Sequence, residues 1–249
     1  MKIEGQTALV TGGTAGIGRE IALQLAARGA RVIVTGRNRE AGEAAVAESG
    51  GRIAFIAADL LRPEDQEWLV SELEARFPDL SLLVNNAGVQ VNMPPTGIGD
   101  AALMAAFRAE IAINLEAPVA LAFGLMPLLA RQRRAAIVNI SSGLAIAPKR
   151  TAPVYCATKA GLSTFSRALR YRCEDSAPHV SVHDVIMAFV DTAMTAGRGT
   201  NKMHPGDAAR AVISGLERGR PDIFVGKARI LALLHRLSPA IAGRILRNG

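Results

Sequence analysis

Cysteine and histidine are scarce in this chain of 249 residues. The two cysteines, Cys156 and Cys173, fall on one expected helix, which is typical of buried thiols in a reducing compartment and argues against a disulfide framework. The four histidines show no metal-ligand spacing and have few acids near them, so we expect no metal site: His179, His183, His204 and His235.

Long apolar runs are also missing. No segment reaches the roughly 18 uninterrupted apolar residues that a membrane span needs. Residues 1–4 lead directly into the first expected strand and leave no room for a signal peptide. We therefore expect a cytoplasmic protein.

Acidic residues are few towards the end of the chain. From Arg218 onwards there are seven Arg or Lys and one acid, Asp222, which gives +6 of the net charge of +7. The basic excess is a tail and not a face spread over the whole chain. We expect no nucleic-acid partner.

Strand and helix signals alternate along the sequence. Strands are expected near 7–11, 31–35, 52–58, 81–85, 135–141, 180–187 and 222–225. Helices are expected near 17–28, 39–48, 64–76, 100–130, 154–175 and 206–218. This order predicts an α/β fold: one domain over 1–249 with a three-layer, doubly wound (Rossmann-type) parallel β-sheet and helices on both faces.

A glycine-rich turn follows the first expected strand. The apolar run 7–11 leads into Gly12, Gly16 and Gly18, and a helical pattern begins near Ile17. Glycines let a phosphate approach the backbone, and a helix N-terminus offers free N–H groups and the positive end of a dipole. The turn could be only a tight connection, but its place between strand and helix favours a dinucleotide site.

Ser142, Tyr155 and Lys159 form a second pattern. Tyr155 and Lys159 are four residues apart on an expected helix, so their side chains point to the same side. An ammonium group there is expected to lower the tyrosine pKa from its usual value of about 10. A nearby serine hydroxyl can hold a carbonyl or alcohol oxygen, so the pattern predicts proton transfer at oxygen.

These residues resemble the short-chain dehydrogenase/reductase family over nearly the whole chain, and within it the DltE-like oxidoreductases. The matching motifs are Thr11-Gly12-x-x-x-Gly16-Ile17-Gly18, Asn85-Asn86-Ala87-Gly88, Asn114, Ser142, Tyr155-x-x-x-Lys159 and Thr192. The family usually has Pro-Gly after the sixth strand, where this chain has Met187-Ala188.

The resemblance implies two sets of site residues. The catalytic set is Asn114, Ser142, Tyr155 and Lys159, with Asn114 holding a water of a proton relay. The nicotinamide cofactor would bind Tyr155 and Lys159 together with Gly12, Thr14, Gly16, Ile17, Gly18, Arg37, Asp59, Leu60, Asn86, Ala87, Val190 and Thr192. Asp59 would contact the adenine amine, although it could also cap the following helix.

The residue after the second expected strand bears on cofactor choice. An enzyme that prefers NAD commonly has Asp or Glu there to bind the ribose 2′-hydroxyl. This chain has Arg37, whose guanidinium suits the 2′-phosphate of NADP(H). A solvated arginine at a helix start is the alternative.

Residues 227–249 form a basic, amphipathic helical tail in which Ser238 caps a helix that begins at Pro239. A stripe of Ile241, Ile245 and Leu246 lies opposite Arg244 and Arg247. Such a pair of helices can lie on anionic lipid. The family habit of forming homodimers and homotetramers instead favours a subunit interface or a wall of the substrate pocket.

The sequence thus predicts an NADP(H)-dependent oxidoreductase that interconverts a small-molecule carbonyl and a secondary alcohol, with Tyr155 as general acid and base. Two alternatives stay open. One is a redox-silent NADP-binding sensor or scaffold protein, which the altered turn at Met187-Ala188 would favour. The other is a peripheral membrane-associated protein that uses the basic tail.

Overall fold

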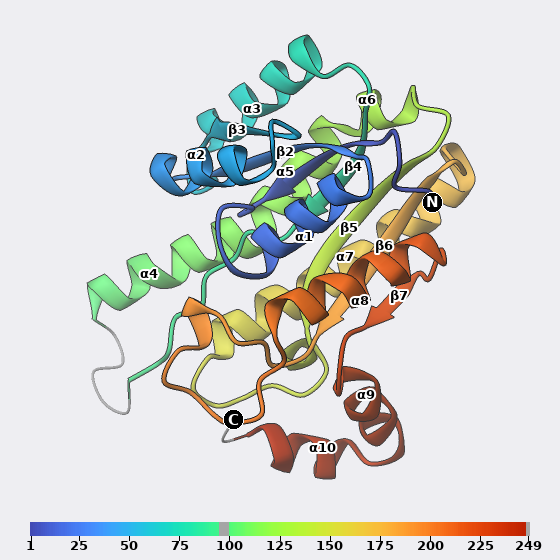
Figure 1. The fold of residues 1–249 in the computed structure, drawn as a ribbon. Helices are drawn as coiled ribbons and strands as arrows, with labels where there is room; N and C mark the ends of the chain where they lie inside the picture. Colours follow the sequence, from blue (N-terminus) through green and yellow to red (C-terminus); the bar gives the residue numbers. More distant parts are fainter. Residues whose placement is uncertain (95–99, 248–249) are drawn as a thin grey trace.

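The computed structural model describes residues 1–94 and 100–247. Its centre is a sheet of seven strands, all parallel, in the order β3-β2-β1-β4-β5-β6-β7 (Figure 1). The strands are β1 (Thr7–Thr11), β2 (Arg31–Gly36), β3 (Ile53–Ala57), β4 (Leu80–Asn85), β5 (Ala135–Ser142), β6 (Val180–Met187) and β7 (Asp222–Phe224). The predicted fold class is confirmed.

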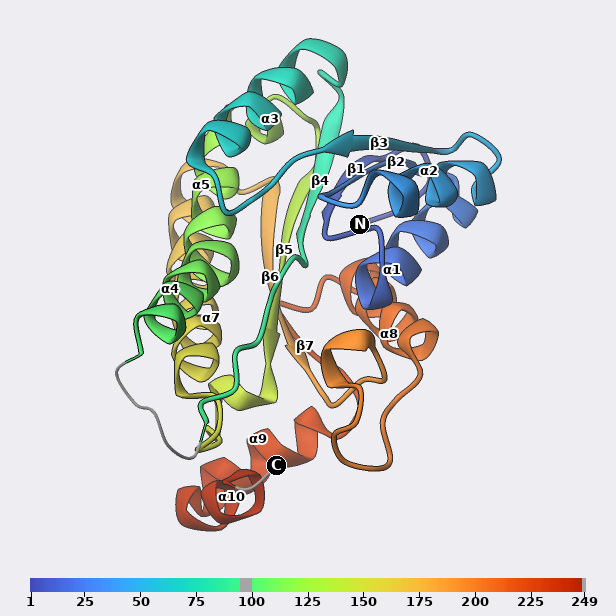
Figure 2. The same ribbon diagram turned by 90° about the vertical axis from the view of Figure 1, so that its left-hand side faces the viewer.

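Helices cover both faces of the sheet and make three layers (Figure 2). One face carries α1 (Gly16–Ala27), α2 (Arg39–Glu48) and α8 (Pro205–Glu217). The other carries α3 (Pro63–Arg76), α4 (Ala101–Ile111), α5 (Ala117–Gly124), α6 (Met126–Ala130) and α7 (Pro153–Ser176). Two apolar clusters, one on each side, fill the spaces between the layers.

The central strands are buried on both sides, as parallel strands between helices must be. Every residue of β1, β4 and β5 is buried. Alternate residues serve the two layers: Ala8 and Val10 belong to the cluster under α1 and α8, whereas Leu9 belongs to the opposite cluster. This explains the short, continuous apolar runs of the sequence.

The prediction of one continuous helix over 100–130 is wrong. The segment has a π-helical turn at Ala112–Glu116 between α4 and α5, and it breaks again at Leu125 before α6. Pro118 and Pro127 lie just after these points. Proline lacks the N–H that continues the α-helical ladder, and its ring crowds the preceding turn.

The order of the strands reverses next to β1. The chain goes from β1 to β2 and β3 on one side, then returns to β4 on the other. In open α/β sheets a crevice forms at such a point, outside the carboxyl ends of the strands. The fold therefore places the segments after β1, β2, β4 and β5 around one opening.

The tail forms α9 (Ala228–Leu237) and α10 (Pro239–Leu246). Ser238 precedes α10, and its hydroxyl accepts a hydrogen bond from the Ile241 N–H at 3.4 Å. Both helices lie at the end of the sheet where β5 and β6 finish (Figure 2). Residues 248–249 of the expected tail lie outside the described residues. Across 1–94 and 100–247, no helix has both the length and the apolarity to span a bilayer.

Candidate active site

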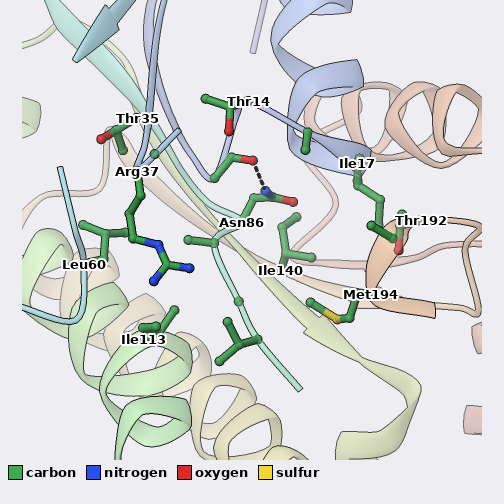
Figure 3. A pocket seen from close by; sticks show the side chains of 18 of the residues that line it. Thr14, Ile17, Thr35, Arg37, Leu60, Asn86, Ile113, Ile140, Thr192 and Met194 are labelled. Atoms are coloured by element: carbon green, nitrogen blue, oxygen red, sulfur yellow. Dashed lines mark hydrogen bonds between the residues drawn. The ribbon is translucent and has the colours of Figure 1, made fainter. Parts of the chain in front are cut away.

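A cavity of about 620 Å³ opens at the carboxyl ends of the strands. Figure 3 shows its lining, with Arg37 reaching into the space between Leu60 and Asn86. Most of the expected site residues line it: Gly12, Thr14, Gly16, Ile17, Arg37, Asp59, Leu60, Asn86, Ala87, Tyr155, Lys159 and Thr192. Four do not: Gly18, Asn114, Ser142 and Val190.

The glycine-rich turn after β1 requires its glycines. Gly12 has φ +61° and Gly16 has φ +54°, in the left-handed region that residues with a Cβ avoid. A Cβ on Gly12 would lie 2.9 Å from the Cα of Ala87. The bare backbone leaves a cradle at the start of α1, which is where a helix N-terminus binds phosphate.

The segment after β4 is tied to this turn by hydrogen bonds. The Asn86 side chain donates to the carbonyl oxygens of Thr11, at 2.9 Å, and of Gly12, at 3.2 Å. The Thr11 hydroxyl accepts from the N–H groups of Asn86 and Ala87, both at 3.0 Å. The two strand ends thus hold each other in place. The Asn86 side chain therefore holds the glycine-rich turn in its conformation.

Gly18 lies behind the turn, outside the cavity. A Cβ there would come within 2.3 Å of both the Asn86 amide nitrogen and the Gly12 carbonyl oxygen. We expect Gly18→Ala to push the two strand ends apart, to destabilise the protein by about 1–3 kcal/mol and to weaken nucleotide binding. Thermal unfolding and calorimetric titration with NADPH test this.

Gly243→Ala is the matched control, because a Cβ at Gly243 in α10 meets nothing within 4 Å. It should leave nucleotide binding unchanged and should not lower the stability. Equal behaviour of the two variants would contradict the tight packing of Gly18.

Arg37 and Asp59 lie on the side of the cavity formed by β2 and β3. Arg37 follows β2, is exposed and extends into the cavity (Figure 3). The Asp59 carboxylate lines the cavity and also accepts a hydrogen bond from the Leu61 N–H at 3.1 Å. Asp59 therefore stabilises the turn before α3, but the N-cap of that helix is Arg62, so the alternative that Asp59 caps the helix is wrong.

Tyr155 and Lys159 stand on the first turns of α7, which begins at Pro153. The Lys159 ammonium lies 5.8 Å from the centre of the Tyr155 ring. It donates a 2.9 Å hydrogen bond to the Ile140 carbonyl oxygen of β5. This bond fixes the lysine between the tyrosine and the sheet.

Burial lowers the pKa of Lys159 to about 8, with the Asp184 and Glu110 carboxylates opposing the shift. Burial raises the pKa of Tyr155 to about 12, and a hydrogen bond with the Ser142 hydroxyl opposes that shift. The expectation that Lys159 lowers the tyrosine pKa is therefore wrong for the protein alone. Loss of hydration is the largest cause of the raised Tyr155 pKa, and the Cys156 and Glu110 side chains raise it further.

A lysine whose pKa is lowered on folding is destabilising while it is charged. Folded and unfolded chains differ in bound protons between about pH 8 and 10.5, and stability rises with pH across that window. Lys159→Met removes this dependence. We compare the free energy of unfolding of the wild type with that of Lys159→Met. The wild-type value minus the variant value should rise by about 2 kcal/mol between pH 7 and pH 10.

Denaturant unfolding at several pH values measures this difference. Lys227→Met, at an exposed lysine, serves as the control and should show no such trend. A constant difference between wild type and Lys159→Met over that range would contradict the shifted pKa.

Ser142 and Asn114 are buried next to residues that line the cavity, although neither is part of the lining itself. The Ser142 hydroxyl, at the end of β5, accepts from the Leu144 N–H at 3.1 Å and is close enough to Tyr155 to lower the pKa of that phenol. The Asn114 amide, in the π-helical turn, accepts from the Val89 N–H and donates to the Val89 carbonyl oxygen, each at 2.8 Å. Asn114 thus anchors the irregular segment that follows β4. The sequence did not indicate this contact.

The segment after β6 closes the far side of the cavity. Thr192 and Met194 line it, and the Thr192 methyl carbon lies 3.3 Å from where a Cβ on Gly16 would stand. Val190 is buried in the core and pairs with Met203 in a short parallel bridge, so its side chain does not reach the cavity. Met187, in place of the usual proline, also lines the cavity.

The sequence analysis named Asn85 only as part of a family motif and did not single out Asn139 or Ser166, yet the three form a buried chain of hydrogen bonds. The Asn85 amide donates to the Asn139 amide oxygen, and the Asn139 amide donates to the Ser166 hydroxyl, each at 2.8 Å. All three side chains are buried, and together they join β4, β5 and α7. This chain sets α7, and hence Tyr155, against the sheet. The sequence gives one sign of this arrangement, because Asn85 and Asn139 are polar residues within largely apolar strand segments.

Glu110 is a second residue that the sequence did not single out. It is fully buried in α4, one helical turn before Asn114, and one carboxylate oxygen accepts from the Val91 N–H at 2.9 Å. Burial raises its pKa, and the charge of Lys159 opposes the shift. The carboxyl group lies close enough to influence the titration of Tyr155 and Lys159.

Sequence comparison identifies relatives of the chain. The short chain dehydrogenase family profile matches residues 6–203. The chain is 38% identical over 198 residues to "Uncharacterized oxidoreductase DltE" of Bacillus subtilis, covering 78% of this chain and 75% of that protein. It is 32% identical to the 3-oxoacyl-[acyl-carrier-protein] reductase FabG of Escherichia coli, covering 78% of each.

Solved structures share the fold. A short chain dehydrogenase from Burkholderia cenocepacia in complex with NADP superposes with a TM-score of 0.86 at 27% identity, covering 100% of both chains. One from Burkholderia phymatum in complex with NAD gives 0.83 at 18% identity, covering 100% of this chain and 97% of that one, and shows the fold alone. With its sheet, glycine-rich turn and Tyr155–Lys159 pair, the chain belongs to the short-chain dehydrogenase/reductase family of oxidoreductases.

Proposed function

We propose that the protein is an NADP(H)-dependent oxidoreductase that interconverts a carbonyl compound and a secondary alcohol. The observation that carries the proposal is the placement of Tyr155 and Lys159, one helical turn apart on α7, in the lining of the 620 Å³ cavity beside the glycine-rich turn. The Lys159 ammonium lies on the same side of α7. A positioned acid beside a nucleotide site is what reversible carbonyl reduction requires.

The residues around the cavity fit a nicotinamide dinucleotide. The turn at Gly12 and Gly16 has no side chains where a pyrophosphate would lie, and the N-terminus of α1 points N–H groups there. Asp59 and Leu60 would hold the adenine, while Thr192 and Lys159 line the opposite part of the cavity. When bound, the cofactor supplies or accepts the hydride.

Proton transfer falls to the side chains at the start of α7. Tyr155 donates its proton to the carbonyl oxygen during reduction and takes it back during oxidation. Ser142 holds the same oxygen with its hydroxyl. Burial keeps the pKa of the free tyrosine high, but the Lys159 ammonium, 5.8 Å from the ring centre, stabilises the phenolate that forms when the proton leaves.

We assign the preference for NADP(H) to Arg37. Its guanidinium reaches into the cavity from the end of β2, where an acid would favour NAD. A guanidinium can bind a phosphate with two charge-assisted hydrogen bonds. The B. cenocepacia relative, whose structure contains NADP, supports this choice.

A panel of quinones, 3-oxoacyl thioesters, ketosteroids, sugars and aldehydes tests the activity. Loss of NADPH absorbance with at least one carbonyl class, and a slower rate with NADH, are the expected results. A protein that binds NADPH but reduces no member of the panel would instead be a redox-silent binding protein.

A further inference from the structure

Helices α9 and α10 have an inner face that packs on the rest of the protein. Ala228 and Ala242 are buried. A side-chain carbon of Leu231 lies 3.0 Å from where a Cβ on Gly143 would stand, beside Ser142. The Arg150 N–H donates to the Arg247 carbonyl oxygen at 3.1 Å. The inner face is therefore already covered.

The outer face of the same helices is apolar and uncovered. Five large aliphatic side chains, 48% to 75% exposed, make up what we term the outer tail stripe: Ile230, Leu233, Leu237, Ile241 and Ile245. In α9 they recur at intervals of three and four residues, and in α10 at four, so they follow one side of each helix. A set of large exposed apolar side chains of this kind marks an interaction surface.

Basic side chains accompany the stripe. From Ile223 to Arg247 the sequence has five Lys or Arg and no Asp or Glu. All five are exposed: Lys227, Arg229, Arg236, Arg244 and Arg247. The partner of this surface must therefore offer both apolar material and negative charge.

A tail-to-tail contact with a second copy of the chain does not meet that requirement. A symmetric contact centred on the tail would place the two tails face to face. The five cations of one tail would then face those of the other with no acid from either tail between them. A membrane surface with anionic headgroups offers negative charge above an apolar interior, which suits an amphipathic helix lying in its plane.

We propose that the outer tail stripe docks on an anionic lipid surface, with the aliphatic side chains in the headgroup layer and the five cations among the headgroups. Docking would leave the packing of the inner face intact. Because Leu231 on that inner face contacts Gly143, the Ser142 side of the active site would lie close to the lipid.

Co-sedimentation of the full-length protein with vesicles tests the proposal. Binding is expected with phosphatidylglycerol vesicles, to be much weaker with phosphatidylcholine vesicles, and to fall as salt is raised. Leu233→Ser/Leu237→Ser should weaken binding at least about tenfold, because two large apolar side chains lose their burial. Arg236→Gln/Arg244→Gln should weaken it about fivefold per arginine.

The matched control is Tyr171→Ser/Arg172→Gln, which removes an exposed apolar and an exposed basic side chain from α7. It should bind as the wild type does. Absence of binding to phosphatidylglycerol, or binding that neither tail variant weakens, would overturn the proposal. So would a smaller mass of Leu233→Ser/Leu237→Ser in light scattering, which would show that a second copy covers the stripe. None of these readouts depends on catalytic activity.

Discussion

Tyr155→Phe should lower kcat by at least about 100-fold and by up to about 10,000-fold, which is the usual effect of losing a positioned acid. Tyr155 lines the cavity, and in the proposed mechanism its hydroxyl gives the proton to the carbonyl oxygen. Phenylalanine keeps the ring and its distance to Lys159, so the dissociation constant for NADPH should change little. Steady-state kinetics with the best carbonyl of the panel, together with calorimetric titration with NADPH, measure both quantities.

Tyr171→Phe is the control for this experiment. Tyr171 is the other tyrosine of the chain, lies on the same helix, and is 58% exposed. Its variant should have the kcat of the wild type. If Tyr155→Phe kept most of its activity, another group would have to supply the proton and the proposed mechanism would fail.

Arg37→Ala should weaken NADPH binding by about 10- to 100-fold, which corresponds to the loss of charge-assisted hydrogen bonds worth about 1.5–3 kcal/mol. NADH binding should hardly change, because NADH has no 2′-phosphate for the guanidinium to bind. The measurement is the ratio of the two dissociation constants in wild type and variant.

Arg39→Ala provides the comparison, since Arg39 is exposed at the start of α2 and does not line the cavity. Arg39→Ala removes one positive charge but no residue of the cavity lining, so it should leave NADPH binding nearly unchanged if the Arg37 contact is specific. Equal weakening of NADPH and NADH by Arg37→Ala, or a wild type that prefers NADH, would show that Arg37 is a solvated surface residue.

The sequence predicted the fold well because local patterns and global topology agree in this chain. The run Thr7–Thr11 is short, apolar and followed by glycines, which predicts a buried strand before a tight turn, and the structure has that strand. The same agreement placed the cofactor cavity, because parallel strands present their carboxyl ends to one edge of the sheet. Twelve of the expected site residues consequently line one cavity.

The sequence did not predict properties that depend on burial in three dimensions. The direction of the Tyr155 pKa shift required knowledge of its surroundings, because spacing showed the nearby Lys159 but not the loss of water. The sequence pattern over 100–130 predicted one continuous helix. It therefore predicted neither the π-helical turn around Asn114 nor the burial of Glu110. Val190 was expected at the cofactor, but the bridge to Met203 draws it into the core.

Hydride transfer to a carbonyl carbon is the central claim, and isotope transfer tests it most directly. The protein is incubated with NADPH deuterated at the nicotinamide C4 position and with the carbonyl class reduced fastest in the panel. Mass spectrometry of the product should show an alcohol that carries one deuterium on the former carbonyl carbon, and Tyr155→Phe should form very little of it. An alcohol without deuterium, or NADPH bound but never consumed with any carbonyl, would contradict the account.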